Sequence, residues 1–245
     1  MPDNITLIRQ TFEQPQKYLT ETRYNIRLRA ETISEFLKSD NVGSILDIGC
    51  GDGSLSRGLI NANNRLTLVD ASQTMLKIAS SHVPEEMSWR VQTINSDFMG
   101  ASLEPQSFNL IICVGVLAYV EDRKAFIARI KSLLKPGGVV IVECSDGAHW
   151  LSHVVAAYQA FRRWLKPVQM QTILRSSSEV TAIFDDIGFK LAGSFLYSLP
   201  LPIMRKLMSQ KFSYSALRFL FGSATHNRNT WLGNECMYCY RSPSQ

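Results

Sequence analysis

The feature that most constrains the fold is a regular alternation of short strand-like stretches with helix-like stretches between residues 44 and 144. The fourth strand-like stretch is apolar throughout, as expected for a strand buried on both faces of a sheet. The five stretches are SILDI (44–48), RLTLVD (65–70), WRVQTI (89–94), FNLIICV (108–114) and VVIVEC (139–144). Strict alternation of β and α predicts a mostly parallel sheet with helices on both faces and right-handed crossovers.

Helical spacing and end signals place the helices between these strands. Apolar residues recur at helical spacing over residues 21–39, and a short helix is expected over 54–61. Ser72 is expected to cap a helix over 73–81. Glu121 and Asp122 open a further helix, which the sequence Lys-Pro-Gly-Gly at 135–138 closes.

The pattern changes after Asp146, where the alternation gives way to longer helical stretches and two late strands. A helix is expected from about His153 to Leu165, and the sequence Ser-Ser-Ser-Glu at 176–179 resembles a capping box that opens another helix. Residues 189–199 predict a sixth strand, and NECMYCYRS at 234–242 predicts the last.

Composition excludes several classes of protein. The chain has 245 residues, of which 45% are hydrophobic and 19% charged, so disorder is excluded. The longest apolar run, 110–120, is too short to span a bilayer, and residues 1–10 show no signal peptide, so we expect a cytoplasmic location. Five Cys without framework spacing indicate reduced thiols. Cys236 and Cys239 stand three apart on a strand and should face opposite sides, so no metal site is predicted.

Charge and aromatic residues are unevenly distributed along the chain. Residues 147–245 carry 11 Lys and Arg against 4 Asp and Glu, whereas residues 1–146 carry 15 against 17. No acidic residue stands between Asp186 and Glu235, and residues 147–245 hold 15 of the 24 aromatic residues. We therefore expect the binding surface to be concentrated in this C-terminal part.

The sequence Asp47-Ile-Gly49-Cys-Gly51-Asp-Gly stands between a predicted strand and a predicted helix. Glycines there let the backbone approach a ligand closely, and a helix start offers free N–H groups. Asp70 ends the next strand, where an acid at the carboxyl edge of a parallel sheet can accept both hydroxyls of a ribose. The alternatives are a tight glycine turn without ligand and a dinucleotide loop, although Ser54 occupies a position where the dinucleotide motif has glycine.

Five motifs in order resemble one family. DIGCGDG, TLVDAS, INSDF, NLIICVGVLAYVED and LLKPGGVVIVE together resemble the class I S-adenosylmethionine-dependent methyltransferases, in their small-molecule branch. The resemblance implies an α/β, Rossmann-like, doubly wound, mostly parallel seven-stranded sheet whose last strand is antiparallel, with a helical N-terminal lid and C-terminal cap insertions. It implies a single domain over 1–245, divided into a lid (1–40), a cofactor-binding core (41–146) and acceptor-binding elements with the closing strands (147–245).

The resemblance also implies which residues bind S-adenosyl-L-methionine. Asp70 would hold the ribose hydroxyls, Asp97 would accept from the adenine amino group, and Arg27 or Arg29 could pair with the methionine carboxylate. The residues so assigned are Asp47, Gly49, Gly51, Asp70, Ala71, Met75, Asp97, Phe98, Val114 and Arg27. Met75 could instead belong to the core, and Asp97 could only cap a turn.

The predicted catalytic residues are Tyr119 and His149. Many small-molecule relatives place His after the fourth strand in a pattern like L-x-H-V, but this chain has Leu-Ala-Tyr119-Val there. Tyrosine, with a pKa near 10, is a poor base at neutral pH. Among the candidate bases His149, His153 and His226, we rank His149 first because it follows the carboxyl end of the fifth strand.

The sequence thus predicts a methyltransferase that modifies O, N or C of a lipophilic or aromatic small molecule, with secondary metabolism as a candidate role. The alternatives are an RNA methyltransferase, which we consider unlikely because no RNA-binding module is visible, and a non-catalytic cofactor-binding module. Residues 201–222 could form a lid over the acceptor, a basic amphipathic contact with a membrane surface, or plain packing. The oligomeric state stays open.

Overall fold

The computed structural model describes residues 23–38, 42–165, 175–199 and 209–244. A seven-stranded sheet forms its centre, in the order β3-β2-β1-β4-β5-β9-β6. Its strands are β1 (Ser44–Ile48), β2 (Arg65–Asp70), β3 (Val91–Asn95), β4 (Phe108–Cys113), β5 (Leu134–Ser145), β6 (Lys190–Tyr197) and β9 (Glu235–Arg241). Strands β1 to β5 pair in parallel, whereas β9 lies between β5 and β6 and is antiparallel to both. The predicted fold class is confirmed.

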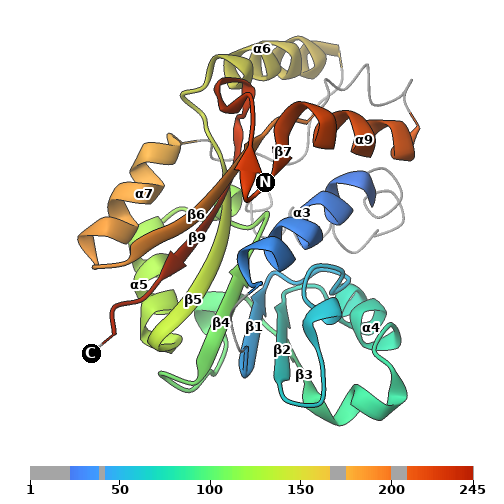
Figure 1. Cartoon of the computed structure of the whole chain (residues 1–245), viewed down its shortest axis with the longest axis vertical. Helices are drawn as coiled ribbons and strands as arrows, with labels where there is room; N and C mark the ends of the chain where they lie inside the picture. The colour runs from blue at the N-terminus through green and yellow to red at the C-terminus, as the bar shows by residue number, and fades with distance from the viewer. Residues whose placement is uncertain (1–22, 39–41, 166–174, 200–208, 245) are drawn as a thin grey trace.

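Helices cover both faces of this sheet (Figure 1). One face packs on α5 (Arg123–Leu133) and α7 (Ser177–Asp186), and the other on α3 (Arg23–Phe36), α4 (Gln73–Ser81) and α9 (Gln210–Phe221). Helix α6 (Trp150–Leu165) follows β5 and crosses one end of the sheet (Figure 1). The small hairpin of β7 (Gly222–Ser223) and β8 (His226–Asn227) follows α9.

Alternation along the strands divides the core into two apolar layers. Ile111 and Val140 face the layer under α5 and α7, whereas Leu110 and Ile141 face the layer under α3 and α9, and all four are fully buried. Cys236 and Cys239 likewise belong to opposite layers, and all five cysteines are free and buried.

Two predicted helix starts are confirmed by their capping bonds. Ser72 accepts a hydrogen bond from the backbone N–H of Met75, and Asp122 accepts one from Ala125. The capping box at 176–179 is different, because Ser176 accepts from Ser178 while Glu179 pairs with Arg175.

The helix expected over 54–61 was wrong, since only the 3-10 turn η1 (Arg57–Leu59) forms there. Gly53 keeps a left-handed backbone with φ of 71°, and Ser54 bonds back to Asp52. The chain is already extended at Ile60. Residues 53–56 thus belong to the glycine loop, and too few residues are left before Ile60 to form a regular helix.

Within the described ranges, every helix is too short or too polar to cross a bilayer. The expected lid over residues 1–40 is described only from Arg23 to Lys38, and residues 200–208 of the 201–222 segment also lie outside the described residues. The described part of the first segment forms α3 and that of the second forms α9, and these two helices contact each other (Figure 1).

Candidate functional site

The glycine loop and Asp70 form one unit at the carboxyl ends of β1 and β2. The Asp70 carboxylate accepts hydrogen bonds from the backbone N–H of Gly51 at 2.9 Å and of Ser72 at 2.8 Å. Gly49 donates its own N–H to the carbonyl of Val69, the neighbouring residue on β2. A carboxylate oxygen can accept more than one hydrogen bond, so Asp70 can hold these loops and also accept from a ligand's hydroxyl groups.

Beside this loop, the conformations of two glycines make room for a ligand. Gly49 and Gly51 have φ of 63° and 54°, in the left-handed region that favours glycine. A Cβ on Gly49 would lie 2.6 Å from a methyl carbon of Val116, whereas a Cβ on Gly51 would meet no atom within 4 Å. The backbone at Gly51 therefore borders open space, as a loop that receives a cofactor should.

Asp47 lies behind the loop rather than in that open space. Only 1% of its surface is exposed, and the hydroxyl of Ser56 donates to its carboxylate at 2.6 Å. Burial, supported by the nearby charges of Asp70 and Asp52, raises the pKa of Asp47 to about 7, against the opposing effect of the Ser56 bond. Asp47 thus stabilises the loop through Ser56, and its buried side chain is not placed to bond directly to a cofactor.

The other sequence-assigned cofactor residues lie around the same edge of the sheet. Asp97 is exposed after β3 and accepts the backbone N–H of Met99 at 2.8 Å, as a capping residue does. Phe98 is buried against Phe126, with ring centroids 4.8 Å apart. Ala71 is half-buried after β2 and Val114 is buried after β4.

Met75 is buried to 1% exposure on α4 and contributes to the core. Of the two roles left open from the sequence, its placement favours packing. Contact with a cofactor would require the adenine to reach a side chain that is closed off from solvent.

Helix α3 separates the two arginines considered for the methionine carboxylate. Arg27 is largely exposed, pairs with Glu31 at 2.9 Å and stacks over the ring of Tyr214. Arg29 lines a cavity on the sheet side of the helix. If either arginine meets the cofactor or the acceptor, the geometry favours Arg29, and Arg27 instead serves the contact between α3 and α9.

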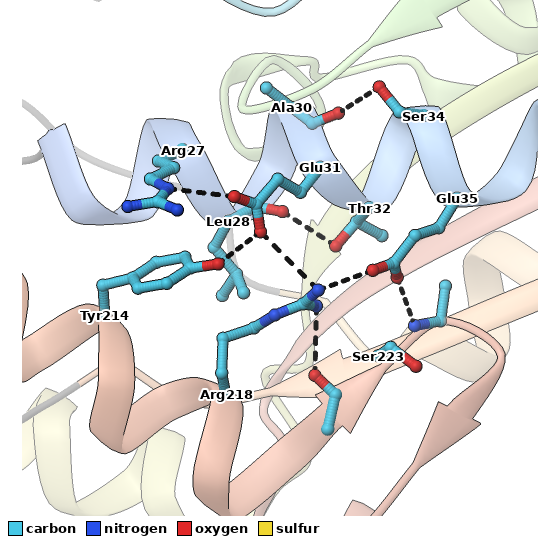
Figure 2. Close-up of polar contacts among 12 residues, drawn as sticks. Arg27, Leu28, Ala30, Glu31, Thr32, Ser34, Glu35, Tyr214, Arg218 and Ser223 are labelled. Carbon is cyan, nitrogen blue, oxygen red and sulfur yellow. Dashed lines mark hydrogen bonds and ion pairs between the residues drawn. The ribbon is translucent and has the colours of Figure 1, made fainter.

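Figure 2 shows that contact, in which charged side chains join α3 to α9. Arg218 of α9 pairs with Glu35 at 2.6 Å, and Tyr214 donates its hydroxyl to Glu31 at 2.5 Å. Glu35 also accepts the backbone N–H of Ala224. Because Leu217 and Phe221 of α9 are buried in the layer beneath α3, the two helices form one braced unit. No described residue of α9 lines the cavity, so this helix supports α3 and does not itself cover the site.

A cavity of about 240 Å³ opens at the carboxyl ends of β4 and β5. The glycine loop follows β1, which neighbours β4, so cavity and loop lie at the same edge of the sheet. Open α/β sheets bind their ligands at this edge. Its wall combines apolar and charged groups from α3, the β4–α5 loop, β5, α6 and β9. The lining residues are Arg29, Gly115, Ala118, Tyr119, Glu143, Cys144, Ser145, Ser152, Val155, Leu199, Asn234 and Glu235.

Glu143 is the most constrained acid of this wall. Its side chain is 2% exposed and meets Arg29 through two contacts, Nε to Oε1 at 2.8 Å and Nη2 to Oε2 at 2.5 Å. The hydroxyl of Tyr197 donates to the same carboxylate at 2.7 Å. Burial raises the pKa of Tyr197 well above its usual value, so its proton stays in place. The charge of Glu143 is therefore matched, and this group acts as a support for the wall.

Glu235 stands opposite Ser145, across the antiparallel pair β5 and β9. Ser145 donates its hydroxyl to Oε2 of Glu235 at 2.7 Å. Burial and the neighbouring charge of Glu143 raise the pKa of Glu235 to about 7. Sequence analysis assigned no role to Glu143, Tyr197 or Glu235. Glu143 ends the motif LLKPGGVVIVE but has no partner nearby in the sequence, and Tyr197 and Glu235 lie on later strands outside the five motifs.

The two predicted catalytic residues have different surroundings. Tyr119 is half-buried and lines the cavity. His149 does not line it, and both of its ring nitrogens contact backbone groups: Nδ1 accepts from Leu151 and Nε2 lies 2.9 Å from the carbonyl of Trp231. His149 therefore acts as a link between α6 and the loop before β9, and the geometry no longer supports it as the base.

Comparisons with known proteins agree with this arrangement. Residues 45–138 match the family model described as a methyltransferase domain. Among curated relatives, the ubiquinone biosynthesis O-methyltransferase of Xanthomonas euvesicatoria is 30% identical over 148 residues, which cover 54% of this chain and 61% of that protein. The match thus spans about three fifths of the relative's length.

Solved structures share the fold at low sequence identity. Magnesium protoporphyrin IX methyltransferase from Synechocystis, with bound S-adenosylhomocysteine, has a TM-score of 0.67 at 15% identity and covers 98% of this chain and 100% of that chain. A protein from Thermotoga maritima described as a possible histamine N-methyltransferase has a TM-score of 0.67 at 14% identity and covers 96% and 98%. Residues 45–138 thus resemble a methyltransferase domain, and the chain shares its fold with solved S-adenosylmethionine-dependent methyltransferases.

Proposed function

We propose that this protein transfers the methyl group of S-adenosylmethionine to a hydroxyl group of a small lipophilic or aromatic molecule. The observation that carries the proposal is the cavity of about 240 Å³ beside the glycine loop, with apolar groups and an acidic wall together. A cavity of roughly 150 Å³ already accommodates benzene, so one substituted ring fits here. The named O-methyltransferase relative supports oxygen over nitrogen or carbon as the methylated atom.

The residues of the glycine loop fit the cofactor that the family uses. S-adenosylmethionine, when bound, supplies a methyl group already activated on a sulfonium, so the protein's task is alignment and exclusion of water. Asp70 would accept the ribose hydroxyls while its carboxylate also holds the backbone N–H groups of Gly51 and Ser72. Asp97 and Phe98 would flank the adenine, and Val114 would face the methionine part, as the family resemblance implies.

On the acceptor side, Ala118, Val155 and Leu199 offer apolar contact for the body of the molecule. Tyr119 can donate a hydrogen bond that orients it. Glu143, held by Arg29 and Tyr197, keeps the opposite wall fixed. A cytoplasmic location and a role in secondary metabolism remain parts of this proposal.

Labelled-cofactor transfer tests the proposed function. Purified protein is incubated with S-adenosylmethionine carrying an isotope-labelled methyl group and a panel of phenols and catechols, then with a cell extract, and the products are read by mass spectrometry. We expect label in small organic-extractable products. Label in RNA would favour the RNA methyltransferase alternative, and tight binding of cofactor with transfer to nothing would favour the non-catalytic module.

Contact with a membrane surface is a second candidate property, favoured by α9. Phe212 and Phe219 are 62% and 77% exposed there, and the basic residue Lys211 stands next to Phe212. Residues 201–208, which complete the proposed segment, lie outside the described residues. Sedimentation with anionic vesicles at low and high salt tests this contact, and Phe212→Ser with Phe219→Ser should abolish it. If the unaltered protein does not sediment with the vesicles at either salt concentration, membrane contact is excluded.

A further inference from the structure

We propose that Glu235 is the general base of this site, which takes the proton of the acceptor's hydroxyl group as the methyl group is transferred. The inference deepens the proposed function and rests on it. It concerns a residue that no motif marks, at the start of β9, on the opposite side of the sheet centre from the glycine loop.

Position is the first reason. Glu235 is the first residue of β9 and pairs with Ser145, the last residue of β5, so its side chain lies at the sheet edge where the cavity opens. Arg29, Tyr119 and Ser152 line the same cavity from three other elements. An acceptor held there would lie between the apolar side of the cavity and this carboxylate.

Free acceptor capacity is the second reason. Ser145 occupies Oε2 of Glu235, but within the described part of the chain no hydrogen bond to Oε1 and no ion pair to Glu235 is formed. Glu143 differs, because Arg29 and Tyr197 satisfy both of its oxygens. The two acids share one arginine, and the arginine is committed to Glu143.

The charged and titratable groups around Glu235 make it a base at neutral pH. Glu143 on β5 raises its pKa and Arg29 on α3 lowers it, while burial has the largest effect and raises it. Tyr197 on β6 and Tyr119 in the β4–α5 loop are phenols, and the described α6 residues that line the cavity, Ser152 and Val155, are uncharged. The resulting pKa of about 7 is close to the pH at which a cellular base works best.

Other candidate bases are excluded by their geometry. The ring nitrogens of His149 both contact backbone groups, and the residue does not line the cavity. Asp47 has a comparable pKa of about 7 but is buried behind the glycine loop and bonded to Ser56. Tyr119 lines the cavity but carries a phenol, which holds its proton at neutral pH.

Proton transfer and methyl transfer both take place at the acceptor's oxygen atom. The acceptor's O–H bond breaks and its proton passes to Oε1 of Glu235, while an oxygen lone pair forms the new bond to the methyl carbon. The bond from sulfur to that carbon breaks with its electron pair staying on sulfur, so the sulfonium becomes a neutral thioether. The products are the methyl ether, S-adenosylhomocysteine and a protonated Glu235, which returns its proton to water when product leaves.

Glu235→Gln tests the proposal, because Gln keeps the shape and can still accept from Ser145. With catechol or another acceptor from the panel above, kcat/KM of the unaltered protein should rise with pH up to about 7 and then level off. In Glu235→Gln it should fall on the order of 10²–10⁴-fold and lose this rise. Glu235→Asp, which retains a carboxylate, should recover part of the rate and show the rise again.

Ser145→Ala is the matched control, because it removes the hydrogen bond that lowers the pKa of Glu235 and leaves the carboxylate. Its rate profile should move to higher pH. NMR titration of carbon-13-labelled Glu side chains provides a readout without any acceptor, since the Glu235 signal is the one missing in Glu235→Gln. Its midpoint should lie near pH 7 in the unaltered protein and higher in Ser145→Ala.

The outcomes separate this inference from the proposed function. An active unaltered protein whose Glu235→Gln variant keeps the rate or the rise with pH would overturn the base and leave the methyltransferase intact. A Glu235 midpoint near the ordinary 4.3 of glutamate would do the same. Unaltered protein that binds cofactor but methylates no hydroxylated probe would overturn the proposed function, and the base with it. Unchanged affinity for S-adenosylhomocysteine shows that each variant is folded.

Discussion

The two halves of the proposed site, a cofactor side around Asp70 and an acceptor side around Glu143, are built in opposite ways. On the cofactor side the polar bonds are short in sequence: Asp70 to Gly51 spans 19 residues, Asp70 to Ser72 spans 2, and Asp47 to Ser56 spans 9. On the acceptor side Arg29 to Glu143 spans 114 residues, and Ser145 to Glu235 spans 90. The cofactor side can be recognised from a motif because its bonding partners are close in the sequence. The acceptor side forms only after distant strands have come together in the sheet.

This difference predicts how each side responds to substitution. On the cofactor side, the bonds to Asp70 come from backbone N–H groups of two loops, so their loss should affect ligand binding more than the fold. Asp47 is buried behind the glycine loop, so a change there should instead appear in stability. Bonds of the acceptor side join α3, β5, β6 and β9, so a change there should affect stability and catalysis together. Four variants test the comparison, in order of expected effect.

Arg29→Met should have the largest effect, because it leaves the buried carboxylate of Glu143 without its cation. We expect the free energy of unfolding to fall by about 3–5 kcal/mol, measured by urea denaturation. Arg27→Met is the matched control on the same helix: its pair with Glu31 is exposed, so its loss should be far smaller. Adding Glu143→Gln to Arg29→Met should recover much of the stability. Equal effects of Arg27→Met and Arg29→Met would contradict the division.

Asp47→Asn should change how stability depends on pH. The pKa of Asp47 is raised from 3.8 to about 7 in the folded protein, so the folded form binds the proton more tightly than the unfolded form. The unaltered protein therefore loses stability from this group as pH rises from about 4 to about 7, and Asn has no proton to lose. The stability difference, variant minus unaltered, should grow across that window by an amount on the order of 2–4 kcal/mol and then stay constant.

Denaturation at several pH values checks this expectation, with Ser56→Ala as a second variant. Ser56→Ala removes the bond that lowers the pKa of Asp47, so the window should extend to higher pH. A difference that does not vary with pH would mean that Asp47 is not held as the structure shows.

Asp70→Ala should weaken cofactor binding by about 1.5–3 kcal/mol for each charged hydrogen bond lost. Calorimetry with S-adenosylhomocysteine measures the loss. Asp52→Ala is the matched control, since it removes the same charge close by, from the glycine loop, and among the described residues its carboxylate accepts hydrogen bonds from Ser54 alone. Because Asp70 and Glu235 belong to different sides of the site, we expect the NMR midpoint of Glu235 to stay unchanged in Asp70→Ala. Unchanged affinity would show that the cofactor binds elsewhere.

Tyr119→Phe should have the smallest effect of the four. It keeps the ring and removes one hydroxyl from the cavity wall, so turnover should fall by about 1 kcal/mol, roughly fivefold, while cofactor affinity holds. The rise of the rate with pH should persist, because Glu235 is intact. Loss of that rise would move the base from Glu235 to Tyr119.

The sequence was sufficient for the sheet and for the location of the glycine loop. Alternating strands and helices predicted the fold, and Ser72 and Asp122 marked two helix starts correctly, because these signals depend on neighbours along the chain. It failed over 54–61, where helical propensity had to compete with the loop's own bonds between Ser54 and Asp52.

The acceptor side was beyond prediction from the sequence for a physical reason. Sequence alone does not say which of Arg27 and Arg29 faces the sheet. Packing decides it: Arg27 lies beside Tyr214 of α9 (Figure 2), whereas Arg29 pairs with Glu143 of β5. His149 stood at the expected place after β5, yet its ring contacts backbone groups of Leu151 and Trp231. Partners that distant strands and loops bring together carry no local signal.

Strand β9 also fixes an order of events during synthesis. It is made after β6 but lies between β5 and β6, so β6 has no place in the sheet until residues 235–241 have left the ribosome. Strands β1, β2 and β4 can pair well before that point. We therefore expect a nascent chain that can already hold its glycine loop while Glu143 and Tyr197 still lack a rigid setting. Chaperones and proteases that meet this protein at the ribosome would encounter the acceptor side as its last unprotected surface.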